Sequence, residues 1–199
     1  MVRPRCDRCA RPLEHCLCAL IPSLHSETQV LILQHPSEVK HALNTARLLA
    51  LGLQSAELWV GEHFEQLAEY LAQPDYRSYL LFPGEAALSL ADAREVADGK
   101  PVRLVVPDGT WRKARKLLYL NPVLEGLPRV TLPAGQASRY RLRKAPAPGA
   151  LSTIEAVTAA LQLLEPEQSF AALLRPFDAL IEAQISAMGE HTFARNHQK

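Results

Sequence analysis

The sequence lacks any long hydrophobic run. No segment approaches the roughly 18 uninterrupted apolar residues of a membrane-spanning helix, so we expect no membrane contact. The opening residues, MVRPRCDRCARPLEHC, contain no apolar stretch of signal-peptide length. We therefore expect a cytoplasmic protein, in which the thiols stay reduced.

The sequence also lacks an excess of charge of either sign. The 22 Lys and Arg residues nearly balance the 21 Asp and Glu residues, and the net charge is +1. This balance excludes the basic field over the whole surface that many non-specific nucleic-acid binders carry. Any nucleic-acid face must therefore be a local patch.

Several common catalytic signatures are missing. The chain contains no G-x-G-x-x-G fingerprint, no P-loop and no G-x-S-x-G nucleophile elbow. A zinc deaminase is excluded as well, because no His-x-Glu pair is followed by Pro-Cys-x-x-Cys. The usual dinucleotide, nucleoside-triphosphate and hydrolase chemistries are therefore not indicated.

Cysteine is absent after residue 18, and this contrast marks residues 1–24 as a small module apart from a main domain over 25–199. Two close thiol pairs joined by a short turn can wrap a tetrahedral ion, and four thiolates form a closed, structural zinc site. The alternatives are four ordinary reduced thiols or a redox pair, the latter disfavoured because no helix begins there to lower a thiol pKa. The predicted metal ligands are Cys6, Cys9, Cys16 and Cys18.

From residue 28 onward, strand and helix patterns alternate. Short apolar strands are predicted at 28–33, 56–60, 78–82, 102–106 and 129–132. Helices are predicted at 37–52, 63–72, 110–120, 151–165 and 167–189, the last with a bend at Pro176. Ser152 and Glu155 have the spacing of a capping box.

Apolar strands separated by helices predict an α/β fold with a mostly parallel sheet and helices on both faces. Ligands of such sheets bind beyond the carboxyl ends of the strands. The segments HPSE, PGE and PDGTW follow the first, third and fourth predicted strands. We therefore expect them to converge on one site.

The segment PDGTW, residues 107–111, is the most informative of these. Asp-Gly can form a hairpin turn, but TWRKARKLLYL fits helical spacing better than strand alternation. Thr110 is a candidate N-cap, and Asp108 lies at the carboxyl edge of the strand. Asp108 either serves the site or only interacts favourably with the helix dipole.

Basic residues are concentrated in two short runs, one after PDGTW and one at 139–144, with Trp111 and Tyr140 beside them. Phosphate-binding cations with aromatic rings between them are typical of an RNA face, whereas a solvated helix face is the simpler alternative. His35, directly after the first strand, is more typical of a packed or capping residue than of a catalyst. The predicted RNA-binding residues are Arg112, Lys113, Arg115, Lys116, Arg141, Arg143 and Lys144.

These segments together resemble the DTW-domain family, named for Asp-x-Thr-Trp, here Asp108 to Trp111. The resemblance covers nearly the whole chain. Its other parts are the two cysteine pairs, QHPSEVKHALNTARL at 34–48, LLFPGE at 80–85, SRYRLRKAP at 138–146 and LSTIEAV at 151–157.

The resemblance implies a tRNA-uridine aminocarboxypropyltransferase of the bacterial type. Such enzymes move the 3-amino-3-carboxypropyl group of S-adenosylmethionine to the imide nitrogen of a uridine and release methylthioadenosine. It also implies a SPOUT-like fold with a knotted C-terminal region and tRNA as the partner; no protein partner is inferred. The alternatives are a SPOUT-like RNA methyltransferase with the same cosubstrate and a non-catalytic zinc-containing RNA-binding protein.

The resemblance further implies the site residues. Asp108 is the candidate catalytic residue, either as a general base or as the anion that binds the cosubstrate's ammonium group. The residues implied to bind S-adenosylmethionine are Leu81, Pro83, Gly84, Asp108, Gly109, Thr110, Trp111, Ser138, Arg139, Tyr140, Ser152, Thr153 and Glu155.

Overall fold

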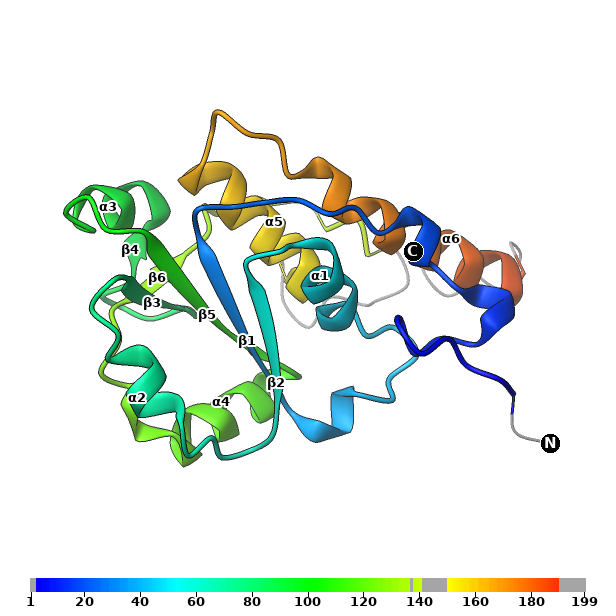
Figure 1. The fold of residues 1–199 in the computed structure, drawn as a ribbon, viewed down its shortest axis with the longest axis horizontal. Coiled ribbons are helices and arrows are strands. Elements are labelled where there is room, and N and C mark those ends of the chain that lie inside the picture. The colour runs from blue at the N-terminus through cyan, green and yellow to red at the C-terminus, as the bar shows by residue number, and fades with distance from the viewer. Residues whose placement is uncertain (1–2, 137, 141–149, 190–199) are drawn as a thin grey trace.

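The computed structural model describes residues 3–136, 138–140 and 150–189 of the 199-residue chain. Its centre is one six-stranded sheet, in which every strand pair is parallel and the order is β2-β1-β5-β3-β6-β4 (Figure 1). The predicted α/β class with a parallel sheet is confirmed. The strands are β1 Gln29–Gln34, β2 Ala56–Val60, β3 Arg77–Leu81, β4 Leu88–Ser89, β5 Val102–Asp108 and β6 Arg129–Thr131.

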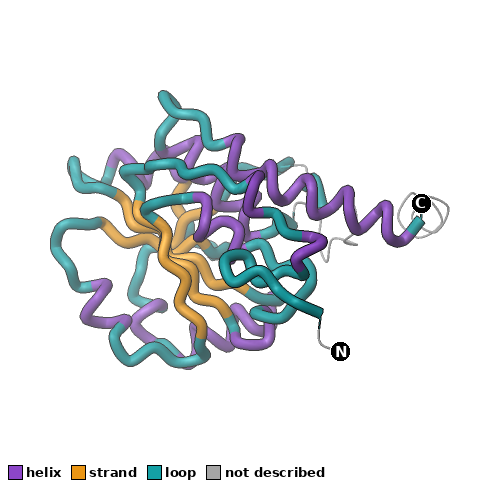
Figure 2. Tube along the Cα trace, turned by 45° about the vertical axis from the view of Figure 1, so that its right-hand side comes forward, coloured by secondary structure: helices purple, strands orange, loops and turns teal. Residues whose placement is uncertain are grey.

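Helices cover both faces of the sheet, as Figure 2 shows. Along β1, Val30 and Ile32 belong to one apolar cluster and Leu31 and Leu33 to the other, because successive strand side chains point to opposite faces. The first face is covered by α1, α3, α5 and α6, and the second by α2 and α4. These helices are α1 Ala46–Gly52, α2 Leu67–Leu71, α3 Leu90–Glu95, α4 Trp111–Leu120, α5 Thr153–Leu164 and α6 Arg175–Met188.

The helix predicted over 37–52 forms only in its second half, as α1. A short 3₁₀ turn, η3 Pro36–Glu38, follows β1, and the His35 ring caps it by accepting a hydrogen bond from the backbone N–H of Ser37 at 3.3 Å. Farther along, the Asn44 amide donates to the carbonyl of Glu38 at 2.9 Å. These local side-chain bonds to the backbone compete with helical hydrogen bonds, which explains why the prediction was wrong here.

The helix predicted over 167–189 also differs from the structure. A 3₁₀ turn, η5 Ala171–Leu174, precedes α6, and Pro176 lies in the first turn of that helix rather than at a bend. Proline costs little there, because the first N–H groups of a helix have no partner within it.

The sequence pattern also missed β4 and α3. Strand β4 is two residues long, and Ser89 then caps α3 by accepting a hydrogen bond from the N–H of Asp92. Strands that short carry no periodicity to recognise.

The cysteine-containing segment packs against the rest of the fold, beside α6 in Figure 1. It holds two 3₁₀ turns, η1 Leu13–His15 and η2 Cys18–Leu20. Arg11 donates to the carbonyl groups of Ala42 at 2.8 Å and Asn44 at 3.0 Å. In return, Arg47 of α1 donates to the carbonyl of Arg8 at 2.9 Å. The division of the chain at residue 24 stays a prediction.

The knotted C-terminal region also stays a prediction, since residues 141–149 and 190–199 lie outside the described part of the chain. No described helix combines the length and the apolar character needed to cross a membrane.

Candidate functional site

A pocket of about 600 Å³ lies at the carboxyl ends of β3, β5 and β6. Its walls come from the loops after these strands and from the start of α5. Parallel strands place successive loops at the same edge of the sheet, as expected from the sequence. Of the residues implied to bind the cosubstrate, those that line this pocket are Leu81, Pro83, Gly109, Trp111 and Thr153.

Sequence reasoning missed one wall of the pocket, the segment 131–136 that follows β6. Outside this segment, Leu81, Val106 and Val130 contribute apolar surface to the pocket. The segment reads TLPAGQ, and a Pro and Gly loop after a predicted strand was the available signal. Ligands of parallel sheets bind beyond the carboxyl ends of the strands, and this rule applied to β6 as well as to β1, β3 and β5 would have identified the segment.

Helix α4 begins at the pocket as predicted. Thr110 is its N-cap and accepts a hydrogen bond from the N–H of Lys113. Ala114 and Leu117 lie on the buried face of α4. Trp111, which the resemblance implied for the cosubstrate site, lines the pocket with 42% of its surface exposed and packs edge-on against Phe82, with ring centroids 5.5 Å apart. Thr110 itself does not line the pocket.

Two glycines allow close approaches around the pocket. Gly109 has a φ of +157°, and a Cβ there would lie 3.0 Å from Cβ of Lys113, so a side chain in the turn before α4 would require Lys113 to shift. A Cβ on Gly84 would lie 2.8 Å from Cδ of Arg129. Gly84 therefore admits the Arg129 side chain, whose guanidinium donates to the carbonyl of Pro83 at 3.1 Å.

Asp108 is held beside the pocket by two donors. The Gln34 amide donates to Oδ2 at 2.7 Å, and the Thr153 hydroxyl donates to Oδ1. Burial raises the pKa of Asp108 above its usual value; the hydrogen bonds from Thr153 and Gln34 oppose this shift, and the nearby Glu38 charge adds to it. The carboxyl group therefore has the environment of a tuned acid–base group, although Asp108 is not itself a lining residue of the pocket.

Glu155 acts as an anchor beneath the site rather than as a wall of the pocket. It forms the predicted capping box of α5, accepting from the N–H of Ser152 at 2.8 Å. The same carboxylate accepts from the Ser138 hydroxyl at 3.1 Å and from the N–H of Arg139 at 2.6 Å. Tyr140 packs edge-on against Phe177, with centroids 5.6 Å apart. These contacts tie the segment before residue 141 to α5 and α6, and the residues that make them do not line the pocket.

The basic residues of α4 divide into two kinds. Lys113 pairs with Glu38 at 2.6 Å, and Lys116 pairs with Glu62 at 2.7 Å. Arg112 and Arg115 are exposed and make no ion pair within the described ranges. The three other residues of the predicted RNA face, Arg141, Arg143 and Lys144, lie outside the described residues.

His35 belongs to the same network. Its Nε2 lies 2.8 Å from Oε1 of Glu62, and its Nδ1 lies 2.9 Å from the Ser37 hydroxyl. Its backbone N–H donates to the carbonyl of Asp108 at 3.0 Å. The expectation of a capping, packed histidine is confirmed by these contacts and by its burial.

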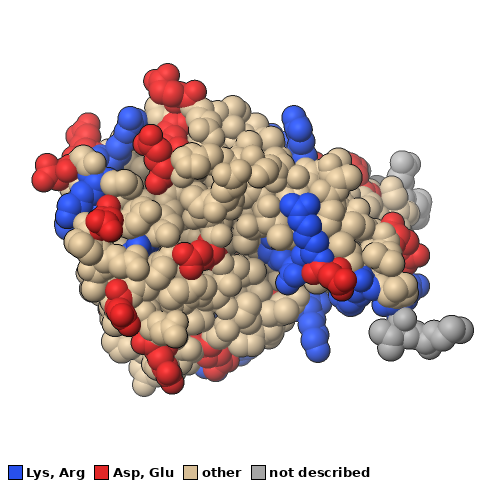
Figure 3. Space-filling model, viewed as in Figure 1, with Lys and Arg blue, Asp and Glu red and all other residues tan. Residues whose placement is uncertain are grey.

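On the face drawn in Figure 3, Lys and Arg side chains gather over the N-terminal segment and the chain next to it, whereas acidic side chains are more frequent at the opposite end. The N-terminal segment lies toward the carboxyl ends of the strands in Figure 1. The charge is therefore locally uneven even though the net charge is close to zero.

The four cysteines meet the geometric demands of a zinc site. Their sulfur atoms lie within 4.8 Å of one another, with Cys6 and Cys18 at 3.6 Å and Cys9 and Cys16 at 3.8 Å. Tetrahedral Zn–S bonds of about 2.3 Å would place sulfur atoms about 3.8 Å apart. No disulfide joins these thiols, and all four are free.

The thiols of the cluster differ in pKa. Hydrogen bonds from the backbone N–H groups of Cys9 and Arg8 lower the pKa of Cys6 to about 6. Burial and hydrogen bonds within the cluster raise the pKa of Cys18 to about 12. A cation among the sulfur atoms would stabilise all four as thiolates, so the donor set fits the ion.

Comparison with known proteins adds to this geometry. One similar protein is tRNA-uridine aminocarboxypropyltransferase 2 of Macaca fascicularis, 31% identical over 98% of this chain and 68% of its own length. The mouse protein of the same name is 33% identical over 92% of this chain and 64% of its own length. The Drosophila melanogaster protein of that name is 33% identical over 92% of this chain and 76% of its own length.

No solved structure matches the chain at a significant level. The sequence profile of the DTW domain, however, matches residues 3–185. This range includes both the cysteine cluster and the pocket. The chain therefore belongs to the DTW-domain family.

Proposed function

We propose that this protein is a tRNA-uridine aminocarboxypropyltransferase that uses S-adenosylmethionine. The observation that carries the proposal is the position of the Asp-Gly-Thr-Trp motif at the rim of the main pocket, in a chain whose relatives are named for this activity. The pocket's volume is within the range of small-ligand sites. Its apolar walls suit an adenosine moiety, and the backbone N–H groups at the start of α5 suit a carboxylate.

The proposed reaction forms one bond and breaks another. The imide nitrogen of uridine loses its proton and attacks the γ-carbon of the cosubstrate, while the bond from that carbon to sulfur breaks. The sulfur keeps the bonding electron pair and leaves as the neutral thioether methylthioadenosine. Because a sulfonium ion is already an activated leaving group, the remaining tasks are proton removal and alignment.

Asp108 is our candidate for the proton acceptor. Each of its oxygens accepts one hydrogen bond, from Gln34 or Thr153, and each retains a second lone pair. The pKa raised by burial brings the carboxylate closer in basicity to its task. In the rival role, the anion would bind the ammonium group of the cosubstrate, and a pH profile distinguishes the two.

For the RNA face we propose Arg112 and Arg115 of α4 together with the basic N-terminal segment. Lys113 and Lys116 contribute less, since Glu38 and Glu62 already neutralise them. Arg141, Arg143 and Lys144 remain proposals from the sequence alone. The four cysteines would hold a structural zinc ion that braces this segment, and their reduced state suits a cytoplasmic location.

The test is a reaction of the purified protein with S-adenosylmethionine and unmodified tRNA, followed by mass spectrometry of both products. We expect methylthioadenosine together with an aminocarboxypropyl nucleoside, and neither from Asp108→Ala. S-adenosylhomocysteine in place of methylthioadenosine would instead establish a methyltransferase. Bound tRNA without any covalent product would contradict catalysis on this substrate.

A further inference from the structure

A second pocket, of about 560 Å³, adjoins the first. Phe82 lines both, so its ring forms part of the wall between them. Phe82 packs edge-on against Trp111 of the main pocket, and the guanidinium of Arg129, which lines the second pocket, lies 5.6 Å from the Phe82 ring centroid. The two pockets are therefore neighbours that share the Phe82 side chain.

Tyr119 on α4 gives this second pocket an exposed aromatic surface. With 82% of its surface exposed, Tyr119 is the most exposed of the large hydrophobic residues in the described ranges. The helix buries Leu117 and Leu118 beside it, so packing of the core does not account for the ring. A bare aromatic face next to a ligand pocket is typical of a surface on which another planar group stacks.

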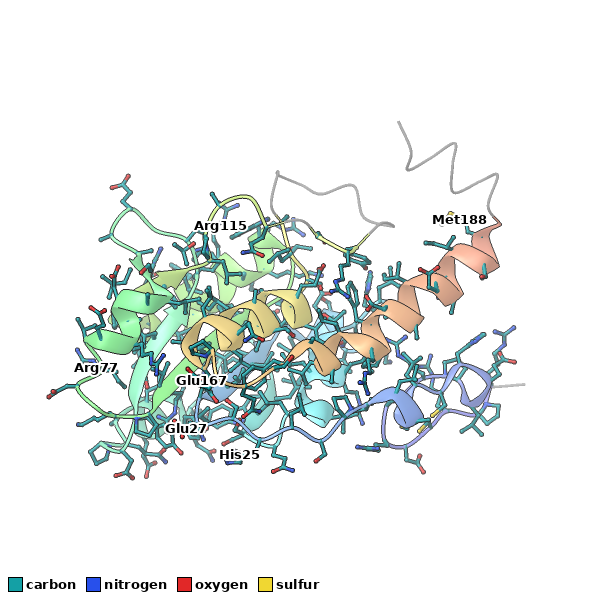
Figure 4. All side chains as sticks on the ribbon, turned by 90° about the horizontal axis from the view of Figure 1, so that it is seen from above. His25, Glu27, Arg77, Arg115, Glu167 and Met188 are labelled. Carbon is teal, nitrogen blue, oxygen red and sulfur yellow. The ribbon has the colours of Figure 1, made fainter. Side chains whose placement is uncertain are left out.

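The charges around the ring favour an anion. Arg129 is paired with Glu125 at 2.8 Å, which leaves that pair neutral. Arg115, which also lines the pocket, is exposed and makes no ion pair within the described part of the chain. In Figure 4, Arg115 lies on the opposite side of the molecule from His25 and Glu27, away from acidic Glu27. The pocket thus combines one open ring with one uncompensated guanidinium.

We propose that the second pocket holds the nucleotide next to the reacting uridine, with its base stacked on Tyr119 and its phosphate bound by Arg115. This proposal rests on the proposed function, since it assumes that the uridine enters the main pocket. RNA-modifying and RNA-binding proteins reach bases that are splayed out of the stack, and aromatic rings with guanidinium groups are their usual platforms. Stacking tolerates any base, so Tyr119 positions the strand without selecting a sequence.

The decisive experiment compares intact tRNA with tRNAs that lack the base on the 5′ or the 3′ side of the modified uridine. With the wild-type protein, removal of the base on one side should raise the KM for tRNA about tenfold, as expected of lost base–aromatic stacking. With Tyr119→Ala, intact and abasic tRNA should have the same raised KM. Tyr119→Phe should restore the sensitivity to base removal, because the ring remains.

Arg115→Ala should raise the KM for tRNA and reduce its salt dependence, while Arg94→Ala, an exposed arginine on α3, serves as the charge-matched control. If Tyr119→Ala is as sensitive to base removal as the wild type, the proposal is wrong. If Tyr119→Ala instead raises the KM for S-adenosylmethionine and leaves the KM for tRNA unchanged, the second pocket binds the cosubstrate. That result would also overturn the proposal.

Failure of the proposed function gives a different result. In that case the wild-type protein forms no methylthioadenosine from any tRNA. Equilibrium binding of an oligoribonucleotide with and without an internal abasic residue then still tests the pocket. A loss of affinity on base removal that Tyr119→Ala abolishes would support the stacking site, and equal losses in both proteins would refute it.

Discussion

The side-chain amide of Gln34 donates a hydrogen bond to the carboxylate of Asp108 at 2.7 Å, across 74 residues of sequence. The contact arises because β1 and β5 are parallel neighbours in which Gln34 and Asp108 are register partners. Gln34 is 1% exposed, so its amide is held in place at the end of a buried strand. The site's acidic group is thus positioned by the sheet itself.

Replacement of Gln34 by Leu should shift the pH dependence of the reaction. The amide bond lowers the pKa of Asp108 against the effect of burial, so its loss raises that pKa further. If the ionised carboxylate is the base, the acidic limb of the pH–rate profile should move up by about one pH unit. Gln54→Leu, at an exposed glutamine bonded to Ser23, is the matched control. An unmoved acidic limb would favour a role for Asp108 outside proton transfer.

Asp108→Asn should remove activity without loss of stability. Because burial raises the folded-state pKa above the unfolded value, the folded protein binds more protons between those two values. Ionised Asp108 therefore lowers the free energy of unfolding as the pH rises through that window. The stability of Asp108→Asn relative to wild type should increase with pH over the same window, measured by denaturant unfolding. Asp98→Asn, at an exposed site, should show no such trend.

The sequence predicted the parts of this site that depend on local patterns. Strands β1 and β5 are buried on both faces, and such strands are mostly apolar, which their runs of Val, Leu and Ile reveal. The convergence of HPSE, PGE and PDGTW follows from parallel pairing alone. The capping box at Ser152 and Glu155 was also visible, because its two members are close in sequence.

The remaining features depend on the order of strands and on contacts across the fold. No local pattern shows that β1 lies beside β5, so the bond between Gln34 and Asp108 was not predictable. The ion pairs of Lys113 and Lys116 need α4 to face the loops after β1 and β2. The predicted RNA face therefore counted two cations whose charge acidic residues within the chain already offset.

Cys9→Ser should release zinc and unfold the N-terminal segment. Cys9 is 4% exposed within the main apolar cluster, and its thiol is one of the four proposed ligands. Structural zinc contributes about 10 kcal/mol or more of apparent binding free energy, which becomes folding free energy of the segment that holds it. Elemental analysis should find one zinc per wild-type chain and none in the variant, with a lower Tm. A metal-free wild-type protein of unchanged Tm would contradict the zinc site.

Arg11→Ala should loosen the same segment without touching its cysteines. The guanidinium donates to the carbonyl groups of Ala42 and Asn44, and their loss should cost about 1–3 kcal/mol. Limited proteolysis should then cut more rapidly within residues 1–24. Arg5→Ala is the control, because among the described residues the Arg5 guanidinium donates only to the carbonyl of Ala10, inside the segment. Equal protease resistance in both variants would show that other contacts hold the segment.

The two kinds of cation on α4 should differ in their effect on tRNA binding. Arg112 is exposed and makes no ion pair within the described ranges, whereas Lys113 is neutralised by Glu38 at 2.6 Å. Plotted against log salt concentration, log K for tRNA binding falls with a slope whose magnitude Arg112→Ala should reduce by about one. Lys113→Ala should change that slope less.

Glu38→Gln reverses the comparison, because it frees the Lys113 charge and should steepen the slope. Binding measured at several salt concentrations for these three variants therefore distinguishes a phosphate-contacting charge from a merely solvated one. Equal slopes for Arg112→Ala and wild type would remove the first turn of α4 from the RNA face, and the Lys113 pair would then have a structural role only.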